Sequence, residues 1–192
     1  MRLFIGVALP DSAREEAAAA CERLKQRTRR AAPRAQIRWV EPANLHVTLW
    51  FLGETKEPAA DAVRSALDSG FAVAPFHLQL ARFGAFPETG SPRVLWMDVA
   101  RGREQLVSLY LAIRDRLAAL GCEPERRAFS PHLTLARVKD ISRSDAPAVR
   151  KVLGGPSPSL STFTADAVTL FRSYTSPHGA RYESLLRVPL KE

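Results

Sequence analysis

The sequences NLHVTL at positions 44–49 and SPHLTL at positions 130–135 are the two stretches that decide the fold of this chain. Each carries His-x-Thr-Leu within a short run rich in apolar and β-branched residues, which is typical of a strand. His132 follows His46 by 86 positions, and Phe163 follows Phe76 by 87, so the second half of the chain repeats the first. A period this long is not that of a solenoid and indicates two similar lobes.

The elements around these motifs follow the order β-α-β-α-β in each half. Apolar runs and alternation predict strands at 3–8, 45–52, 76–80, 94–100, 132–138, 163–171 and 181–188. Helical spacing predicts one helix that begins with a capping box at Ser12 and Glu15, and others at 59–67, 103–120 and 146–153. Residues 27–34 read as a basic exit from the first helix, 84–92 as a loop, and 173–179 as a turn connection.

We therefore expect an α+β fold of two pseudo-symmetric lobes whose antiparallel sheets face a central cleft. The chain is predicted to form a single bilobal catalytic domain over residues 1–192. The internal repeat divides it into 1–92 and 93–192, with exchange of strands between the lobes allowed.

The composition is that of a globular protein rather than a disordered one, since 46% of the 192 residues are apolar and 25% are charged. No apolar run approaches the roughly 18 residues of a membrane span. The apolar stretch at 3–8 stops at Pro10 and reads as a strand rather than a signal peptide. Cys21 and Cys122 fit neither a zinc spacing nor a disulfide framework. A cytoplasmic protein with free thiols is the expectation.

The net charge of +8 includes 23 arginines and suggests a polyanionic partner, with nucleic acid as the first candidate. The planar fork of arginine suits phosphate oxygens. Heavy arginine and alanine usage also follows from a G+C-rich genome, so the charge alone does not decide between these two explanations.

Residues i and i+2 of a strand point to one face, so each motif presents an imidazole beside a hydroxyl. If a pseudo-twofold axis relates the lobes, His46 with Thr48 meets His132 with Thr134 across one cleft. One neutral and one protonated histidine form an acid and base pair, and two hydroxyls can hold non-bridging oxygens. This constellation suits a phosphodiester. A metal site is not expected, because zinc needs three or four ligands and the motifs contain no Asp, Glu or Cys.

The motifs and their surroundings resemble those of the 2H phosphoesterases. Within them the chain is similar to the bacterial and archaeal RNA 2′,3′-cyclic phosphodiesterases, also called 2′-5′ RNA ligases or LigT-like proteins. The resemblance covers nearly the whole chain. It rests on RLFI at 2–5, WV at 39–40, NLHVTL at 44–49, FLGE at 51–54, GAFP at 84–87, RVLW at 93–96 and FSPHLTLAR at 129–137.

The resemblance implies hydrolysis of RNA 2′,3′-cyclic ends to 2′-phosphomonoesters without a metal. We also expect no cofactor and a protein that acts as a monomer. It assigns His46 as the proton donor and His132 as the proton acceptor, with Thr48 and Thr134 on the phosphate. Two further positions carry over in the same way. Arg137 would approach the phosphate, and Phe51 would pack on the terminal base.

Strict alternation would turn Phe51 and Arg137 away from the cleft, so they reach it only where a strand ends or bulges. The same alternation places Trp50 on the His-Thr face, as part of an aromatic platform or as a cap on the cleft rim. The remaining histidines, His77 on a solvated strand face and His178 in a turn, are expected to be surface residues.

Two other functions remain open. The first keeps the same chemistry in the cleft. The protein would either join RNA ends, such as tRNA halves, through a 2′-5′ bond in the reverse reaction, or act on a small cyclic nucleotide instead of RNA. A different class is an RNA-end-binding module without turnover, whose affinity would fall steeply with salt.

Overall fold

The computed structural model describes residues 1–124, 127–176 and 179–191. Along the chain the elements are β1 (Arg2–Ala8), α1 (Asp11–Ala31), β2 (Gln36–Trp39), the 3-10 turn η1 (Pro42–Asn44), β3 (His46–Glu54), α2 (Glu57–Asp68), β4 (Phe71–Ala72), β5 (Phe76–Phe86), β6 (Val94–Arg101), α3 (Arg103–Ala118), β7 (His132–Asp140), α4 (Ala146–Leu153), β8 (Phe163–Ala165), β9 (Ala167–Ser176) and β10 (Gly179–Lys191). Among the described residues, no helix is long and apolar enough to cross a membrane.

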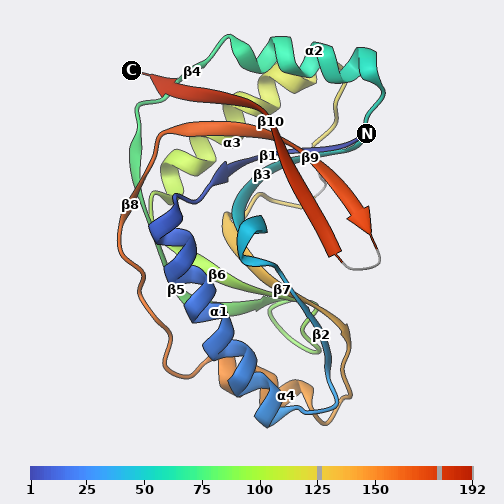
Figure 1. The fold of residues 1–192 in the computed structure, drawn as a ribbon, viewed down its shortest axis with the longest axis vertical. Helices are drawn as coiled ribbons and strands as arrows, with labels where there is room; N and C mark the ends of the chain where they lie inside the picture. The colour runs from blue at the N-terminus through green and yellow to red at the C-terminus, as the bar shows by residue number, and fades with distance from the viewer. Residues whose placement is uncertain (125–126, 177–178, 192) are drawn as a thin grey trace.

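The strands form two groups that meet in the middle of the molecule. The order is β4-β10-β9-β1-β3-β7-β6-β5-β8, with β2 paired to β7. We call β4, β10, β9, β1 and β3 the terminal lobe, because it holds both ends of the chain, and the other strands the central lobe (Figure 1). Each lobe therefore takes strands from both halves of the sequence.

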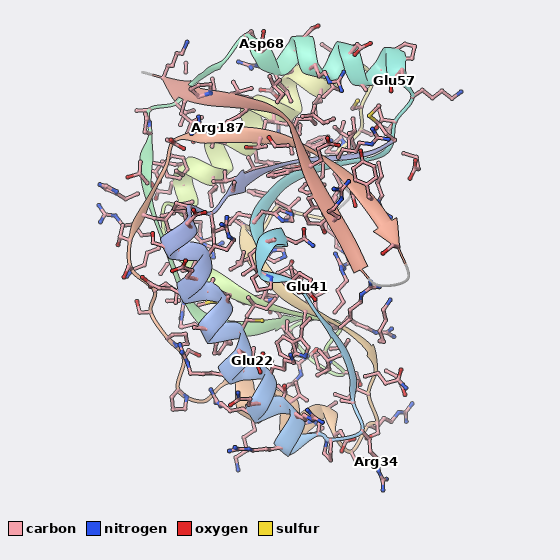
Figure 2. All side chains as sticks on the ribbon, in the orientation of Figure 1. Glu22, Arg34, Glu41, Glu57, Asp68 and Arg187 are labelled. Atoms are coloured by element: carbon pink, nitrogen blue, oxygen red, sulfur yellow. The ribbon has the colours of Figure 1, made fainter. Side chains whose placement is uncertain are left out.

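The helices are exchanged between the lobes as well. The helices α2 and α3 pack together against the terminal lobe, and α1 and α4 pack together against the central lobe (Figure 1). On α1 the small and apolar side chains of Ala17, Ala20 and Leu24 are fully buried, and the Cys21 thiol contacts the carbonyl of Leu135 on β7. Figure 2 shows the ends of α2, Glu57 and Asp68, at one end of the molecule and Arg34, after α1, at the other.

The lobes are joined where β3 and β7 touch. Val47 pairs with Leu133 in an antiparallel register, and within the described part of the chain this is the single paired position between the two strands. Both side chains are fully buried, as are Leu49 and Leu135 two positions further along. The apolar side of each His-x-Thr-Leu motif therefore anchors the interior at the junction, which leaves the His-Thr side facing the other way.

The expected α+β class and the two repeated lobes are confirmed, while several boundaries were wrong. The strand β5 extends to Phe86 and includes the first three residues of the segment expected to be a loop at 84–92, while the remainder of that segment is not in a strand. The ring of Trp96 on β6 lies across Gly84, where any Cβ would collide with it. The short strands β2 and β4 were not predicted, and the strand expected at 163–171 is divided into β8 and β9.

The first helix also differs from its prediction. It begins at Asp11 after Pro10, without a side-chain hydrogen bond at the cap, so the capping box expected at Ser12 and Glu15 is absent. It continues to Ala31 through most of the segment read as an exit, because Thr28 is buried and bonded to the carbonyl of Leu24. His178 lies outside the described residues.

The junction of the lobes makes a stability prediction. Leu133→Ala removes a fully buried side chain from the point where the lobes join, and we expect the free energy of unfolding to fall by about 2–5 kcal/mol. Urea unfolding would measure the loss. The control is Leu111→Ala on α3, whose side chain is 38% exposed and which should change stability by less than about 0.5 kcal/mol. Equal effects of the two substitutions would contradict this account of the junction.

Candidate active site

His46 is held at the start of β3 by its own backbone surroundings. Its Nδ1 lies 2.7 Å from the carbonyl oxygen of Asn44, and because a carbonyl only accepts, Nδ1 carries the hydrogen. The other nitrogen, Nε2, is then the acceptor of the neutral ring, and the Thr48 hydroxyl donates to it at 2.9 Å. The tautomer and the orientation of the imidazole are therefore fixed locally.

His132 repeats this arrangement at the start of β7. Its Nδ1 lies 2.7 Å from the carbonyl oxygen of Ser130, again two residues earlier in the chain. Its Nε2 has no hydrogen-bond partner among the described residues. The two histidines, 86 positions apart, thus have the same tautomer, with the hydrogen on Nδ1 and Nε2 as the acceptor.

The contact between the strands brings the two motifs together. With Val47 opposite Leu133, antiparallel pairing places His46 opposite Thr134 and Thr48 opposite His132. The two motifs are close together, since the charge of His132 lowers the pKa of His46, and Thr48 and His132 line one cavity. Both imidazoles and both hydroxyls therefore share one face at the junction of the lobes, which is the arrangement that one phosphate group bound between them needs.

Aromatic rings enclose His46. The ring centroids of Phe4, Tyr182 and Phe171 lie 4.6, 5.3 and 5.8 Å from that of the imidazole. This burial lowers the pKa of His46 to about 4, with a smaller lowering by the charge of His132 and an opposing effect of the hydrogen bond to Asn44. In the free protein at neutral pH, His46 is uncharged.

The surroundings of His132 are less apolar than those of His46 and include charged side chains. Burial lowers its pKa first, the hydrogen bond to Ser130 opposes this, and the positive charges of Arg137 and Arg103 lower it further. Asp98 acts in the opposite direction and pairs with His132 across β6 and β7. The edge of the Phe86 ring faces the imidazole, with the centroids 5.1 Å apart. In the free protein the neutral form of both imidazoles is therefore favoured.

A matching bulge in each strand decides which side chains follow the motif. Thr48 pairs with Gly6 and Trp50 with Ile5, so Leu49 is the extra residue; Leu135 is the extra residue of β7 in the same way. Each bulge reverses the alternation. Phe51, which is 48% exposed, and Arg137, which is exposed, therefore lie on the face of the two histidines.

The same bulge overturns the expectation for Trp50. Its side chain is buried at 5% exposure, with its ring centroid 5.6 Å from that of Tyr110 on α3, so it does not cap the rim, although it still lines the cavity that Thr48 and His132 border. The physical reason is the extra residue at Leu49, which turns the following position into the interior. Two consecutive buried residues, Leu49 and Trp50, are the mark of this change in phase.

Sequence reasoning missed the rings that surround the histidines. Phe51, Phe4 and Phe171 form a row across β3, β1 and β9, with neighbouring centroids 6.1 and 4.9 Å apart. Tyr182 on β10 completes the enclosure of His46. In the sequence Phe4, Phe171 and Tyr182 read as ordinary strand residues. Only the pairing of β1 with both β3 and β9, and of β9 with β10, brings them to the face on which Phe51 lies.

Metal ligands are not grouped in the residues at 1–124, 127–176 and 179–191, where no three His, Cys, Asp or Glu side chains lie together as an ion would require. His77, the remaining histidine within these ranges, is exposed, as expected. That catalysis needs no metal stays a prediction.

Comparison with known proteins gives the same picture. The profile of the LigT like Phosphoesterase family matches twice, over residues 12–96 and 98–182. An Archaeoglobus fulgidus protein named RNA 2′,3′-cyclic phosphodiesterase is 34% identical over 96% of this chain and 98% of its own length. A Methanocaldococcus jannaschii protein of the same name is 31% identical over 95% and 97%.

Solved structures agree with these relatives. Escherichia coli LigT in complex with 3′-AMP has a TM-score of 0.78 at 28% identity, with 100% of this chain and 98% of that chain covered. Thermus thermophilus TT0787 has a TM-score of 0.75 at 30% identity, with 99% and 98% covered. Two lobes that each bring a His-x-Thr pair to one junction define the 2H phosphoesterase class. Within that class, the chain belongs to the LigT-like phosphoesterase family.

Gly6 supplies a test of how the site is positioned. A Cβ on Gly6 would lie 2.7 Å from the carbonyl oxygen of Val47 and 3.3 Å from Cδ2 of His46, so Gly6→Ala must displace β3 and the imidazole. We expect phosphodiesterase activity to fall at least about tenfold, since small misplacements of catalytic groups are costly. The control, Gly154→Ala, meets only ordinary contacts and should keep its activity. Full activity of Gly6→Ala would contradict the assigned position of His46.

The pKa values of the two histidines can be followed by NMR titration. In the free protein we expect both to titrate below 6.5, with His46 near 4, because burial disfavours the charged ring. Inorganic phosphate bound between the rings should raise both pKa values, since an anion stabilises the protonated form. In His132→Ala the pKa of His46 should rise, because a like charge is removed. A histidine with a pKa above 6.5 in the free protein would refute this account of the environment.

Proposed function

We propose that this protein hydrolyses RNA 2′,3′-cyclic phosphodiester ends to 2′-phosphomonoesters by paired-histidine catalysis without a metal. The observation that carries the proposal is the register of β3 and β7, which places two His-Thr pairs on one face at the junction of the lobes. The relatives named RNA 2′,3′-cyclic phosphodiesterase, which align over nearly the whole chain, support the same reaction.

In this proposal His132 is the proton acceptor and His46 the proton donor. Water attacks phosphorus in line with the departing 3′ oxygen, and His132 Nε2 takes its proton. His46 Nε2 gives a proton to the 3′ oxygen as the P–O3′ bond breaks. The anionic phosphate supplies what the free site lacks, because its charge raises the pKa of His46 from about 4 and allows this ring to enter the reaction protonated.

Four further side chains would bind the substrate. Thr48 and Thr134 donate hydrogen bonds to the non-bridging oxygens, where negative charge increases in the transition state. Phe51 stacks on the terminal base, a contact that is tolerant of sequence, and Arg137 pairs with the phosphate. The exposure of Phe51 and Arg137 on the histidine face supports these roles.

We further propose that the protein acts on RNA as a monomer in the cytoplasm. Both histidines and both threonines come from one chain, so the site needs no second copy. The free thiols of Cys21 and Cys122 suit a reducing compartment.

Product analysis tests the reaction. An oligonucleotide with a 2′,3′-cyclic end should yield a 2′-monophosphate; a 3′-monophosphate would reverse the leaving group. His46→Ala and His132→Ala should each lower kcat by about 10²–10⁴-fold, because each removes a proton-transfer group. His77→Ala, at an exposed strand position, is the control and should keep full activity.

A chelator tests whether the proposed hydrolysis proceeds without a metal ion. Activity after dialysis against EDTA should equal that of the untreated protein. Loss of activity that a divalent cation restores would overturn the metal-independent mechanism. RNA that binds tightly but stays unchanged with the native protein would favour a binding module instead.

A further inference from the structure

Asp98 on β6 lies directly opposite His132 on β7. Cross-strand partners of an antiparallel pair project to the same face and are within reach of each other. The neighbours of Asp98 along the strand, Met97 and Val99, are buried, so its own side chain points to the face of the imidazole. Aspartate is disfavoured in strands, so its place here reflects the contacts that it makes rather than strand propensity.

Three donors hold the Asp98 carboxylate in position. The backbone N–H of Val99 donates to Oδ1 at 2.9 Å, and Nη2 of Arg82 on β5 lies 2.9 Å from Oδ2. The guanidinium of Arg103, at the start of α3, pairs with Oδ1. The side chain of Asp98 is only 18% exposed, whereas both arginine side chains are exposed. The carboxylate is therefore fixed, and it is shielded from water more than either of its partners.

The backbone of β5 is distorted where it supplies Arg82. Ala81 pairs with Asp98 and Phe83 with Met97, so Arg82 is the extra residue of a bulge. Its φ of 55° lies in the left-handed region, which is uncommon for residues other than glycine and costs free energy. This strained residue places its guanidinium on the carboxylate, which indicates that the position of Asp98 matters.

The other charged groups around His132 disfavour its protonation. Arg137 on its own strand and Arg103 on α3 each lower its pKa, and within the described ranges Asp98 is the carboxylate whose charge raises it. From β3, His46 faces it, and a proton on either ring disfavours a proton on the other. The imidazolium that forms when His132 accepts a proton therefore depends on Asp98 for its countercharge.

The far side of His132 offers no substitute. There it borders a cavity whose described lining includes the rings of Phe86, Tyr110 and Phe129, and whose charged residue is Arg127. Aromatic rings carry no countercharge, and another arginine adds positive charge. Neither takes the place of the carboxylate on β6.

We propose that Asp98 is a positioning residue of the reaction, as the counter-ion of the imidazolium that His132 becomes when it takes a proton from the attacking water. The inference rests on the proposed function, because it uses His132 as the acceptor. The proton goes to Nε2, the hydrogen on Nδ1 stays bonded to the carbonyl oxygen of Ser130, and Asp98 stays ionised. The carboxylate acts through space on a charge that develops in the transition state, without touching the substrate.

An NMR titration of His132 in the free protein separates this role from a structural one. Asp98→Asn keeps the shape and can still accept the Val99 N–H, and the pKa of His132 should fall by about 0.5–1, since a nearby negative charge is lost. Arg103→Gln breaks the same ion pair from its other side, and the pKa should rise, since a positive charge is lost. An ion pair with a purely structural role would give both variants changes of the same sign.

Hydrolysis of a 2′,3′-cyclic mononucleotide gives the second measurement. Asp98→Asn should lower kcat by about 3- to 10-fold, the factor that corresponds to the expected pKa change, with KM within about twofold of the native value. Asp98→Glu keeps the charge and should restore most of kcat. The control is Asp166→Asn, which removes an exposed ion pair with Arg187 and should match the native protein in both measurements.

The outcomes are distinct. An unchanged pKa of His132 in Asp98→Asn, or changes of the same sign in Asp98→Asn and Arg103→Gln, would overturn the role of Asp98. A raised KM with an unchanged kcat would place Asp98 on the substrate and overturn it as well. Arg103→Gln leaves the carboxylate in place, so its titration decides the sign even if Asp98→Asn fails to fold. Opposite pKa changes in a protein that leaves the cyclic phosphate intact would support the pairing of Asp98 with His132 while the proposed function fails.

Discussion

The antiparallel contact of Val47 with Leu133 is the constraint on which the rest of this protein depends. It joins the two lobes, and it does so at the residues between the histidine and the threonine of each motif. Since side chains alternate along a strand, burial of these two apolar residues turns both His-Thr pairs to the opposite face. The stability of the junction and the assembly of the site therefore both follow from one strand pairing. That pairing joins two copies of the same motif, which an internal duplication of the chain supplies.

The bulges at Leu49 and Leu135 add a second layer to this symmetry. They occupy the same place in both strands and convert a position that alternation would bury into one that faces the histidines. The residue at this position, the fifth after the histidine, differs between the two repeats. One side of the junction therefore receives the aromatic ring of Phe51 and the other the guanidinium of Arg137. The symmetric framework therefore presents two different groups, an exposed aromatic ring and an exposed positive charge.

The electrostatic state of the free site is matched to an anionic substrate. Rings from three strands of the terminal lobe exclude water from His46, so its charged form is disfavoured until a negative group is bound. The carbonyl oxygens of Asn44 and Ser130 keep the hydrogens on the Nδ1 atoms, so Nε2 is the acceptor nitrogen of each neutral ring. In the free site the neutral form of His46 is therefore favoured.

Sequence alone determined the class of fold, the duplication and the four residues His46, Thr48, His132 and Thr134, because period-two alternation and a repeated motif are local properties. Local patterns predicted two features wrongly. The capping box at Ser12 is absent, because no side chain bonds to the backbone at the start of α1, and the side chain of Trp50 is buried. Only the tertiary structure decided which strands and helices share a lobe, where Phe4, Phe171 and Tyr182 meet His46, and how Tyr110 and Phe129 come to lie beside His132. These features depend on pairings between segments far apart in the chain, and a bulge that adds one residue to a strand changes the face of every side chain after it.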